Sequence, residues 1–339
     1  MKFPIQHITF EITQECNLNC IYCYNYWRIN GSTLQKTTFK QTSKTFKKIF
    51  DTIDFQHITF TGGEPFLADG LEEFVLKCRL KRKGVSIITN GTTAKLTAYR
   101  VLLDLGVALL EIPFHSANPT IHDALTGSHG SFDKVLKSIH FLKESKAEIC
   151  LVCVLTKANI NNFQQTLDAA NNLGVKRFMI ARYNIGGRGM ENARNILPSL
   201  SGLRSAFKIA NDYSQKTKMK ISANVCIPFC IIDPNLYPNV PISSCGTDLT
   251  KRPITIDSFG NIRMCNHSPR VLGNIHHETI NSILTSNHAK EWDTTCPSYC
   301  SECNQWSKCM GGCRAASEQM GRSLENADPV IEFMNEGSK

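Results

Sequence analysis

Three cysteines near the start of the chain have a spacing that suits a metal centre. Cys16, Cys20 and Cys23 lie within eight residues and follow a strand-like run over residues 8–13. A mononuclear zinc site normally closes its tetrahedron with a fourth protein ligand. Three thiolates can instead hold three irons of a 4Fe–4S cube, which leaves the fourth iron open to a small molecule. The spacing therefore predicts an iron–sulfur centre that does chemistry.

A second motif follows the next apolar run of the chain. Residues 57–60 are strand-like, and Gly62, Gly63, Glu64 and Pro65 come almost directly after them. Glycines lack a Cβ atom, so their carbonyls can approach the ammonium group of a ligand closely, and the proline ends the strand. Alone, such a segment indicates only a turn. Its place one strand–helix unit after the cysteines favours a ligand site beside the metal centre.

Together the two motifs resemble the signatures of the radical S-adenosylmethionine superfamily. In that family the open iron chelates the amino and carboxylate groups of the methionine moiety, and Tyr22 matches the aromatic residue that usually precedes the third cysteine, near the adenine. The resemblance implies that Cys16, Cys20 and Cys23 bind a 4Fe–4S cluster. It also implies that Tyr22, Gly62, Gly63, Glu64 and Pro65 contact the cofactor, which yields a 5′-deoxyadenosyl radical that abstracts hydrogen from a substrate.

The alternation of apolar runs and amphipathic stretches predicts an α/β fold, a partial (β/α)6 TIM-type barrel followed by a small cysteine-rich domain. Parallel strands with right-handed crossovers would curl into an open barrel, with functional residues in the loops at the carboxyl ends of the strands. We expect the barrel over 1–217, a linker over 218–239 and the cysteine-rich domain over 240–339. Strands are expected near 8–13, 57–61, 85–89, 108–114, 148–155 and 177–183, and helices near 38–53, 71–83, 93–105, 131–144, 161–173 and 199–216.

Polar residues end the third and fourth predicted strands. Thr89 and Asn90 resemble the polar strand end that lies near the bound cofactor in the family. Ser116 follows the fourth strand, and the resemblance makes it a candidate for holding the cofactor's sugar or carboxylate. The neighbouring His115 has two equally weighted interpretations. It belongs either to that cofactor site or to the end of the strand as a structural, hydrogen-bonded histidine.

The sixth predicted strand ends in Arg182 and is followed by a glycine-rich segment, 186–189. The guanidinium fork of Arg182 could pair with a carboxylate of the cofactor or substrate, because it suits bidentate contact. The glycine-rich segment lacks the Gly-Lys-Ser/Thr ending of a phosphate loop. It indicates either a surface turn or a loop that approaches the substrate.

Cysteines return in the last third of the chain, at spacings typical of metal ligands. The pattern resembles the SPASM extension of radical S-adenosylmethionine enzymes, which commonly houses two auxiliary iron–sulfur clusters, and a zinc ribbon is the alternative. In that family pattern, the first auxiliary cluster takes the thiols equivalent to Cys245, Cys265 and Cys313. The second takes those equivalent to Cys300, Cys303 and Cys309.

The resemblance leaves the auxiliary clusters short of ligands. No cysteine follows Asp328, where the family usually has the last thiol of the second cluster. Three outcomes stay open: an oxygen ligand such as Asp328, a thiol such as Cys296, or an absent or labile second cluster. Cys226 or Cys230 could complete the first cluster, or its iron could stay open to substrate. One or two auxiliary clusters are therefore expected.

Composition and charge limit the class of protein. Of the 339 residues, 42% are hydrophobic, no apolar stretch is long enough to span a bilayer, and no signal-peptide core is present. We therefore expect a cytoplasmic protein with no membrane or nucleic-acid partner. Fifteen cysteines, an odd number, fit metal clusters better than disulfides. The net charge is +9, and the basic run 77–83 could attract an acidic peptide or a flavodoxin- or ferredoxin-type electron donor, although a solvated helix face is the commoner meaning of such a run.

The family resemblance predicts a peptide- or protein-modifying enzyme, in ribosomal-peptide or cofactor-precursor maturation, that catalyses oxidation, cross-linking or epimerisation. Only about seven residues precede the first strand, so no fused leader-recognition domain is expected. A separate recognition protein would supply that role, or the substrate would be small. The alternative activity is a small-molecule dehydrogenase or oxidase acting on an aminocyclitol, a haem precursor or a similar metabolite. A non-catalytic iron–sulfur or zinc scaffold is the alternative of another class, and no general base is singled out.

Overall fold

The computed structural model describes residues 2–29, 31–93, 95–145, 148–246, 248 and 252–336. Within them, ten strands form one sheet in the order β10-β9-β8-β1-β2-β3-β4-β5-β6-β7. Neighbouring strands from β8 through β7 are parallel, and only the β8–β9 and β9–β10 pairs are antiparallel. The strands are β1 (Phe3–Thr13), β2 (Ile53–Gly62), β3 (Gly84–Ile88), β4 (Leu109–Pro113), β5 (Glu148–Leu155), β6 (Arg177–Arg182), β7 (Lys220–Ala223), β8 (Ile254–Asp257), β9 (Asn261–Arg263) and β10 (Gly273–Asn274).

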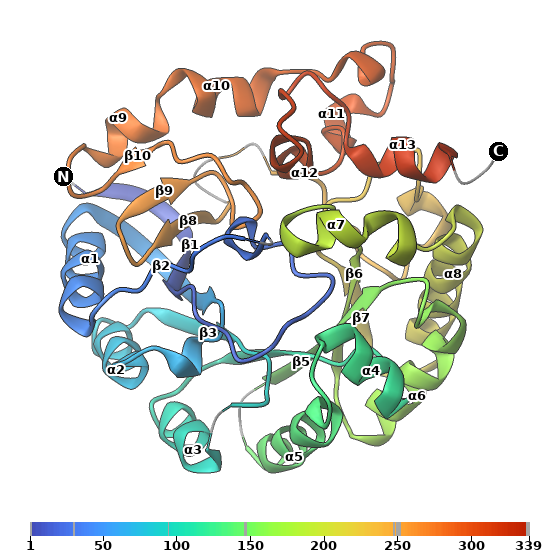
Figure 1. Ribbon diagram of the computed structural model, residues 1–339, viewed down its shortest axis with the longest axis horizontal. Coiled ribbons are helices and arrows are strands. Elements are labelled where there is room, and N and C mark those ends of the chain that lie inside the picture. The colour runs from blue at the N-terminus through green and yellow to red at the C-terminus, as the bar shows by residue number, and fades with distance from the viewer. Residues whose placement is uncertain are drawn as a thin grey trace.

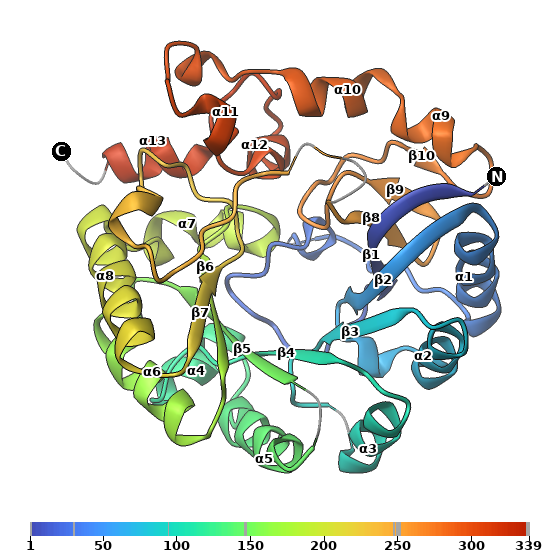
Figure 2. The same ribbon diagram turned by 180° about the vertical axis from the view of Figure 1, so that it is seen from behind.

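The parallel strands curl into an open ring with helices on its outside, and the C-terminal helices cross the open side of the ring (Figures 1 and 2). The predicted α/β partial barrel is therefore confirmed, including all six expected strands. The helices are α1 (Phe39–Thr52), α2 (Leu71–Leu80), α3 (Leu96–Asp104), α4 (Pro119–Thr126), α5 (Ser131–Lys143), α6 (Phe163–Asn172), α7 (Gly187–Ile196), α8 (Leu200–Lys216), α9 (Ile280–Leu284), α10 (Asn287–Thr294), α11 (Trp306–Cys309), α12 (Arg314–Gln319) and α13 (Pro329–Glu336).

Helix α1 shows how the sequence builds one strand–helix unit. Thr38 caps it, because its hydroxyl accepts from the Gln41 N–H while the Gln41 side chain accepts from the Thr38 N–H. Such a cap stabilises a helix by about 1 kcal/mol. The apolar face of α1 presents Phe46 to Phe10 of β1 and Phe60 of β2, with ring centroids 5.8 and 6.1 Å apart. A strand that is buried on both faces needs apolar side chains at nearly every position, as a continuous run.

The sheet extends beyond the six predicted strands at both ends. β7 lies in segment 218–239, which was predicted to be a linker, and it pairs with β6 from Arg177↔Lys220 to Ile180↔Ala223. That segment therefore carries a strand of the barrel sheet. At the other end, β8 pairs with β1 in parallel from Ile8↔Ile254 to Glu11↔Asp257. The cysteine-rich region is thus joined to the barrel by backbone hydrogen bonds, and its boundary at residue 240 stays a prediction.

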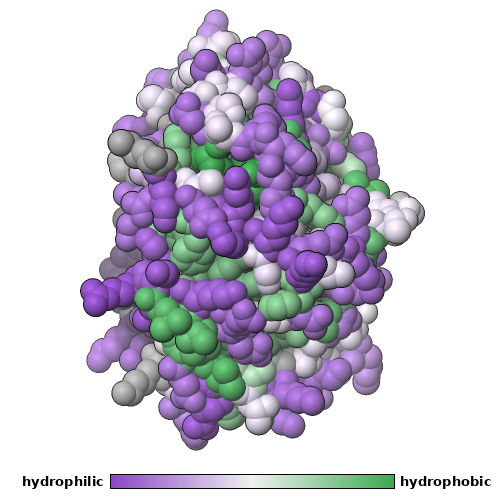
Figure 3. All heavy atoms as spheres, turned by 90° about the vertical axis from the view of Figure 1, so that its left-hand side faces the viewer, coloured by the Kyte–Doolittle hydropathy of each residue, from purple (hydrophilic) through white to green (hydrophobic). Residues whose placement is uncertain are grey.

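The face of the molecule seen in Figure 3 is mainly hydrophilic, with a contiguous hydrophobic patch at its lower left. Cations of the basic run 77–83 are partly neutralised, since Lys77 pairs with Glu73 at 2.6 Å and Lys83 with Asp54 at 3.4 Å. These contacts fit the solvated-face interpretation, and an electron donor at this site stays a prediction. Among the described residues, no helix has the length and apolar character needed to cross a bilayer.

Candidate active site

The loop after β1 carries Cys16, Cys20 and Cys23 across the mouth of the ring (Figure 1). Burial, together with the charges of Cys23 and Cys16, raises the pKa of the Cys20 thiol to about 12. The three thiols therefore share one poorly solvated site and would release their protons on binding a metal. In the described part of the chain, no three Cys, His, Asp or Glu residues gather around a single ion. A 4Fe–4S cube takes one thiolate per iron, so its ligands stand further apart than those of one ion.

Helix α4, which the sequence analysis missed, holds this loop in place. The Asn19 and Ile21 N–H groups donate to the carbonyls of Thr126 and Leu125, each at 3.1 Å. The ends of α4 do carry recognisable signals. The Asn118 side chain caps its start before Pro119, and Gly127 ends it with a left-handed φ of 64°. These cap residues could have revealed the helix.

Gly62 and Gly63 serve close backbone packing against the cysteine loop. A Cβ atom on Gly62 would lie 2.2 Å from the Thr13 carbonyl oxygen, and one on Gly63 would lie 2.0 Å from that of Glu15. The Gly63 and Glu64 N–H groups donate to these two oxygens at 2.8 and 2.7 Å. The glycines thus fix the loop to the end of β2. Their predicted contact with a ligand's ammonium group, and that of Pro65, stays a prediction.

The buried side chain of Glu64 links the motif to the end of β3. Its carboxylate accepts from the Thr89 hydroxyl and the Asn90 N–H, both at 2.7 Å. The Asn90 amide in turn donates to Asn17 at 2.8 Å and faces the Cys16 sulfur at 3.8 Å. Burial raises the pKa of Glu64 to about 7, against the effect of these hydrogen bonds. Three of the predicted cofactor residues are therefore one connected group beside the first cysteine.

Tyr22 connects the cysteine loop to His115. The Val154 N–H donates to His115 Nδ1 at 3.3 Å, so Nε2 carries the proton and donates to the Tyr22 oxygen at 2.5 Å. Hydrogen bonding by the Tyr22 hydroxyl favours the Cys20 thiolate and lowers the pKa of that thiol, although burial raises it more. Burial lowers the pKa of His115 well below its usual value, which keeps the ring neutral. His115 is therefore a hydrogen-bonded strand-end histidine beside the cysteine loop, and a role for it toward the cofactor stays a prediction.

Tyr22→Phe should lower the reduction potential of a cluster bound to Cys20. A hydrogen bond to the ligand sulfur favours the more negative, reduced cluster. If the equilibrium constant of that bond is tenfold larger in the reduced state than in the oxidised state, its loss lowers the reduction potential by about 60 mV. The measurement is a redox titration followed by electron paramagnetic resonance. Tyr24→Phe is the control, because that hydroxyl accepts from Asn266 instead. Equal potentials for Tyr22→Phe and the parent enzyme would contradict the assignment.

Two predicted cofactor residues have partners within the chain. The buried Ser116 hydroxyl accepts from the Asn118 N–H at 3.0 Å, and its contact with the cofactor stays a prediction. Arg182 was expected to meet a carboxylate of the cofactor or substrate. Its carboxylate partner is instead Asp328, and its Nε donates to the Cys226 carbonyl at 2.8 Å. This buried arginine is therefore satisfied by Asp328 and by the carbonyls of Cys226 and Tyr183.

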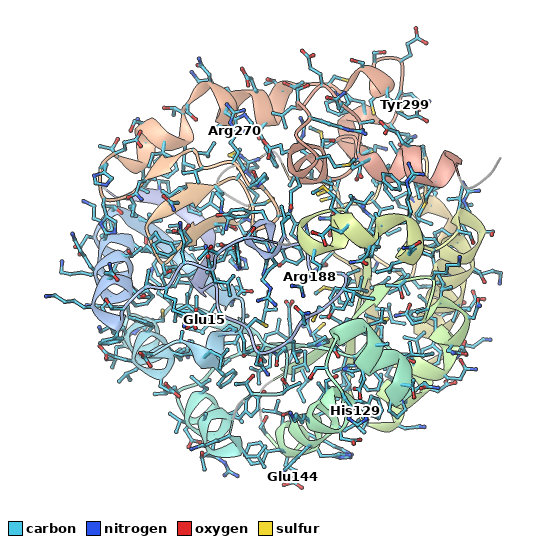
Figure 4. All side chains as sticks on the ribbon, in the orientation of Figure 1. Glu15, His129, Glu144, Arg188, Arg270 and Tyr299 are labelled. Carbon is cyan, nitrogen blue, oxygen red and sulfur yellow. The ribbon has the colours of Figure 1, made fainter. Side chains whose placement is uncertain are left out.

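Arg188, which the sequence analysis did not single out, lies near the centre of the ring (Figure 4). The glycine-rich segment begins α7 here and packs on the cysteine loop, with the Gly189 N–H donating to the Cys23 carbonyl at 3.0 Å. The Arg188 charge acts on the Cys23 thiol and lowers its pKa, although burial raises it more. Its buried Nη1 has no hydrogen-bond partner among the described residues. Arg188 is thus the better candidate for the carboxylate contact expected of Arg182.

Arg188→Met should weaken binding of S-adenosylmethionine about tenfold or more. The lost contact is a hydrogen bond to a charged group, which contributes about 1.5–3 kcal/mol. Isothermal titration calorimetry of the anaerobically reconstituted protein measures the Kd, and Arg188→Lys, which keeps the charge, should lose less. An unchanged Kd in Arg188→Met would assign this guanidinium to the substrate or to structure.

The C-terminal thiols form two groups, of which the first surrounds Cys245. Cys226, Cys245, Cys265 and Cys313 pack together around one small apolar cluster that includes Trp292. A hydrogen bond from Cys226 lowers the pKa of the Cys245 thiol, with Arg314 and Arg252 acting in the same direction. Thiolate is the metal-binding form. The three thiols expected to bind a first auxiliary cluster are therefore together, with Cys226 beside them.

The second group comprises Cys300, Cys303 and Cys309, which line one cavity. A left-handed turn separates this group from Cys313, since Met310, Gly311 and Gly312 have φ values of 58°, 77° and 86°. The turn reverses the chain direction, so Cys309 faces the second group while Cys313 faces the first. The division of thiols expected from the family pattern is thus present in the fold.

A thin polar layer separates the cysteine loop from the first C-terminal group. The Gln319 amide donates to the carbonyls of Tyr24 and His267 at 2.8 and 2.7 Å and accepts from the Gly187 N–H. The Tyr24 and His267 rings are 3.9 Å apart. Asn184 bonds His267 and faces the Cys313 sulfur at 3.7 Å. These side chains therefore connect the cysteine loop to the first C-terminal group by direct contacts.

Comparison with known proteins gives matches to both parts of the chain. Residues 10–170 match the Radical SAM superfamily, and residues 245–305 match the SPASM iron–sulfur cluster-binding domain. The chain is 27% identical over 329 residues to the antilisterial bacteriocin subtilosin biosynthesis protein AlbA of Bacillus subtilis, covering 92% of this chain and 68% of AlbA. It is 22% identical over 340 aligned positions to PqqA peptide cyclase of Granulibacter bethesdensis, covering 96% and 87%.

Solved structures share the fold. Streptococcus suis SuiB bound to precursor peptide SuiA has a TM-score of 0.74 at 17% identity, covering 97% of this chain and 75% of SuiB. Native anSMEcpe with bound AdoMet has a TM-score of 0.75 at 18% identity, covering 98% and 96%. The superfamily match includes the cysteine loop, and the SPASM match includes Cys245, Cys265, Cys300 and Cys303. The chain therefore belongs to the radical S-adenosylmethionine superfamily and carries a C-terminal SPASM domain, with S-adenosylmethionine, a 4Fe–4S cluster and auxiliary iron–sulfur clusters as its cofactors.

Proposed function

We propose that this enzyme modifies a peptide or protein by oxidation, cross-linking or epimerisation. The observation that carries the proposal is that the alignments with AlbA and PqqA peptide cyclase cover 92% and 96% of the chain, hence both the barrel and the SPASM region. One relative is named for the biosynthesis of a bacteriocin and the other for cyclisation of a peptide. SuiB, which shares the fold, was solved with a precursor peptide bound.

The site's own residues suit this chemistry. When bound, the cluster and S-adenosylmethionine supply a 5′-deoxyadenosyl radical that takes a hydrogen atom from the substrate. Cys16, Cys20 and Cys23 would hold the cluster, and Glu64 fixes the neighbouring strand ends through Thr89 and Asn90. Each part is positioned by backbone or buried hydrogen bonds, which limits movement of the reacting groups.

The nearby SPASM thiols support a net oxidation. The side chains of Tyr24, His267, Asn184 and Gln319 form a continuous set of contacts from the cysteine loop to Cys313 of the first auxiliary group. An electron left on the substrate after loss of hydrogen could therefore pass to the C-terminal region. Oxidation or cross-linking uses such an acceptor, whereas epimerisation needs none.

The test measures 5′-deoxyadenosine release by anaerobically reconstituted enzyme with dithionite. Peptide-sized and metabolite-sized fractions of extract from the protein's own cells are compared. Stimulation by the peptide fraction above the uncoupled background is expected, and mass spectrometry should then find a peptide that has lost a pair of hydrogens. An epimerised peptide would keep its mass but take up deuterium from D2O.

The Cys16→Ala variant serves as the control for both fractions, because it keeps the fold but lacks one cluster ligand. Any product that it forms is unrelated to the radical site. Stimulation of the parent enzyme only by the metabolite-sized fraction would overturn the proposal in favour of a small-molecule dehydrogenase. Absence of cleavage under every condition would favour a non-catalytic scaffold.

A further inference from the structure

The segment between β7 and the SPASM domain carries two cysteines that point to different thiol groups. Cys226 hydrogen bonds Cys245 and lies near Cys313, so it belongs with the first group. Cys230 is four residues further on, and the charges that act on its thiol are those of Cys309, Cys303 and Asp328. The Cys300 thiol is in turn affected by the charges of Cys309, Cys296, Cys230 and Cys303. Cys226 and Cys230, although only four residues apart, therefore belong to different thiol groups.

A cavity of about 170 Å³ confirms the place of Cys230. Its walls include four cysteines, Cys230, Cys300, Cys303 and Cys309, with apolar contacts from Pro228, Phe229, Trp306 and Ile331. The Phe229 N–H donates to the Cys309 sulfur at 3.2 Å, which holds the segment against this wall. Tyr299, also on the wall, lies at the outer edge of the molecule (Figure 4).

Asp328 and Cys296, the two ligands that the sequence suggested for the second cluster, are less well placed than Cys230 to bind it. Both oxygens of Asp328 are already hydrogen bonded, one by the Cys313 N–H at 2.7 Å and by Arg182, the other by the Val330 N–H at 3.1 Å. Cys296 lies near Cys300 but does not line the cavity, and its thiol faces the Pro297 carbonyl at 3.6 Å. Asp233 lines the cavity, but its Oδ1 accepts from the Asn235 N–H at 3.0 Å.

We propose that Cys230 is the fourth ligand of the second auxiliary cluster, in the role that the family pattern gives to a cysteine after Asp328. Cys300, Cys303, Cys309 and Cys230 then supply one thiolate for each iron of a 4Fe–4S cube, as such clusters require. Cys226 completes the first group in the same way. The segment 226–230 therefore joins both clusters, and neither has an open iron for substrate. The inference concerns the cofactors and does not depend on the peptide substrate.

The experiment uses the full chain with Cys16, Cys20 and Cys23 all replaced by alanine, so that the remaining iron belongs to the SPASM domain. Into this background we place Cys230→Ala, Cys230→Ser, and the controls Cys296→Ala and Asp233→Asn. Iron, zinc and acid-labile sulfide are measured per chain after anaerobic reconstitution. Electron paramagnetic resonance spectra are recorded before and after reduction by dithionite. Circular dichroism checks that each variant is folded, which is expected because Cys230 is exposed.

Cys230→Ala should lose about four irons per chain, or retain a three-iron cluster with its own oxidised-state spectrum. Cys230→Ser should keep more iron with an altered spectrum, because serine offers an oxygen ligand. Cys296→Ala and Asp233→Asn should match the background protein. An unchanged iron count and spectrum in Cys230→Ala would overturn the proposal, as would loss of iron in Cys296→Ala instead. Zinc without sulfide in the background protein would also overturn it.

Discussion

Replacing Cys16, Cys20 or Cys23 by alanine is expected to abolish cleavage of S-adenosylmethionine. Each removes one of the three thiols carried by the loop after β1, and the charges of Cys23 and Cys16 both act on the Cys20 thiol. A 4Fe–4S cube with an open iron needs all three protein ligands. Release of 5′-deoxyadenosine should fall to the level of dithionite without enzyme, as measured by liquid chromatography under anaerobic conditions.

The SPASM domain should keep its iron in these variants, because its thiols lie in separate groups behind the Tyr24–His267 layer. Iron analysis distinguishes this outcome from general collapse. Cys78→Ala is the matched control, since that thiol is buried in α2 away from every cluster and acts as a small apolar side chain. Loss of all iron after a single change in the cysteine loop would contradict independent clusters.

Arg263→Met should lower the free energy of unfolding by about 3–5 kcal/mol. Arg263 of β9 forms a buried ion pair with Glu11 of β1 and donates to the Ser268 carbonyl at 2.7 Å. Its guanidinium also lies over the Tyr26 ring, 4.9 Å from the centroid. Removing the arginine leaves the carboxylate of Glu11 uncompensated in the core. Denaturant unfolding of the reconstituted protein, followed by far-ultraviolet circular dichroism, measures the change.

Two further variants separate charge from packing. Glu11→Leu combined with Arg263→Met removes both charges and should recover most of the lost stability. Arg177→Met breaks an exposed pair with Glu148 at 2.7 Å and should cost no more than about 1 kcal/mol. If the double variant is as unstable as Arg263→Met alone, packing of the arginine on the aromatic rings, and not the buried charge, is the cause.

The sequence predicts the elements with strong local signals. The six barrel strands are apolar runs followed by helices with a repeating apolar face, so their type and order follow from periodicity. The cysteine loop and the Gly62–Pro65 motif could likewise be placed at strand ends. β7 escaped prediction because a strand of four residues, Lys220–Ala223, is too short to show a period.

Contacts between distant residues could not be predicted in the same way. Arg182 and Asp328 are 146 positions apart, and nothing near either one indicates the pairing. The division of Cys226 and Cys230 between two thiol groups depends on where segment 300–313 folds back. Gly63 was predicted from its motif, but its close approach to the Glu15 carbonyl depends on the chain segment after the neighbouring strand. These contacts depend on tertiary packing, which the local sequence around each residue does not indicate.

The pairing of β8 with β1 has a mechanical consequence. A barrel produced without its SPASM region would expose the unpaired edge of its first strand. Such an edge can pair with a strand of another molecule, so the truncated barrel should self-associate. In the whole chain this edge is paired with β8 by backbone hydrogen bonds, which hold β1 and β8 together. The spacing between the cysteine loop and the thiols near Cys313 is then fixed in part by these backbone hydrogen bonds. Moving the barrel and the SPASM region apart would require breaking the pairing of β1 with β8.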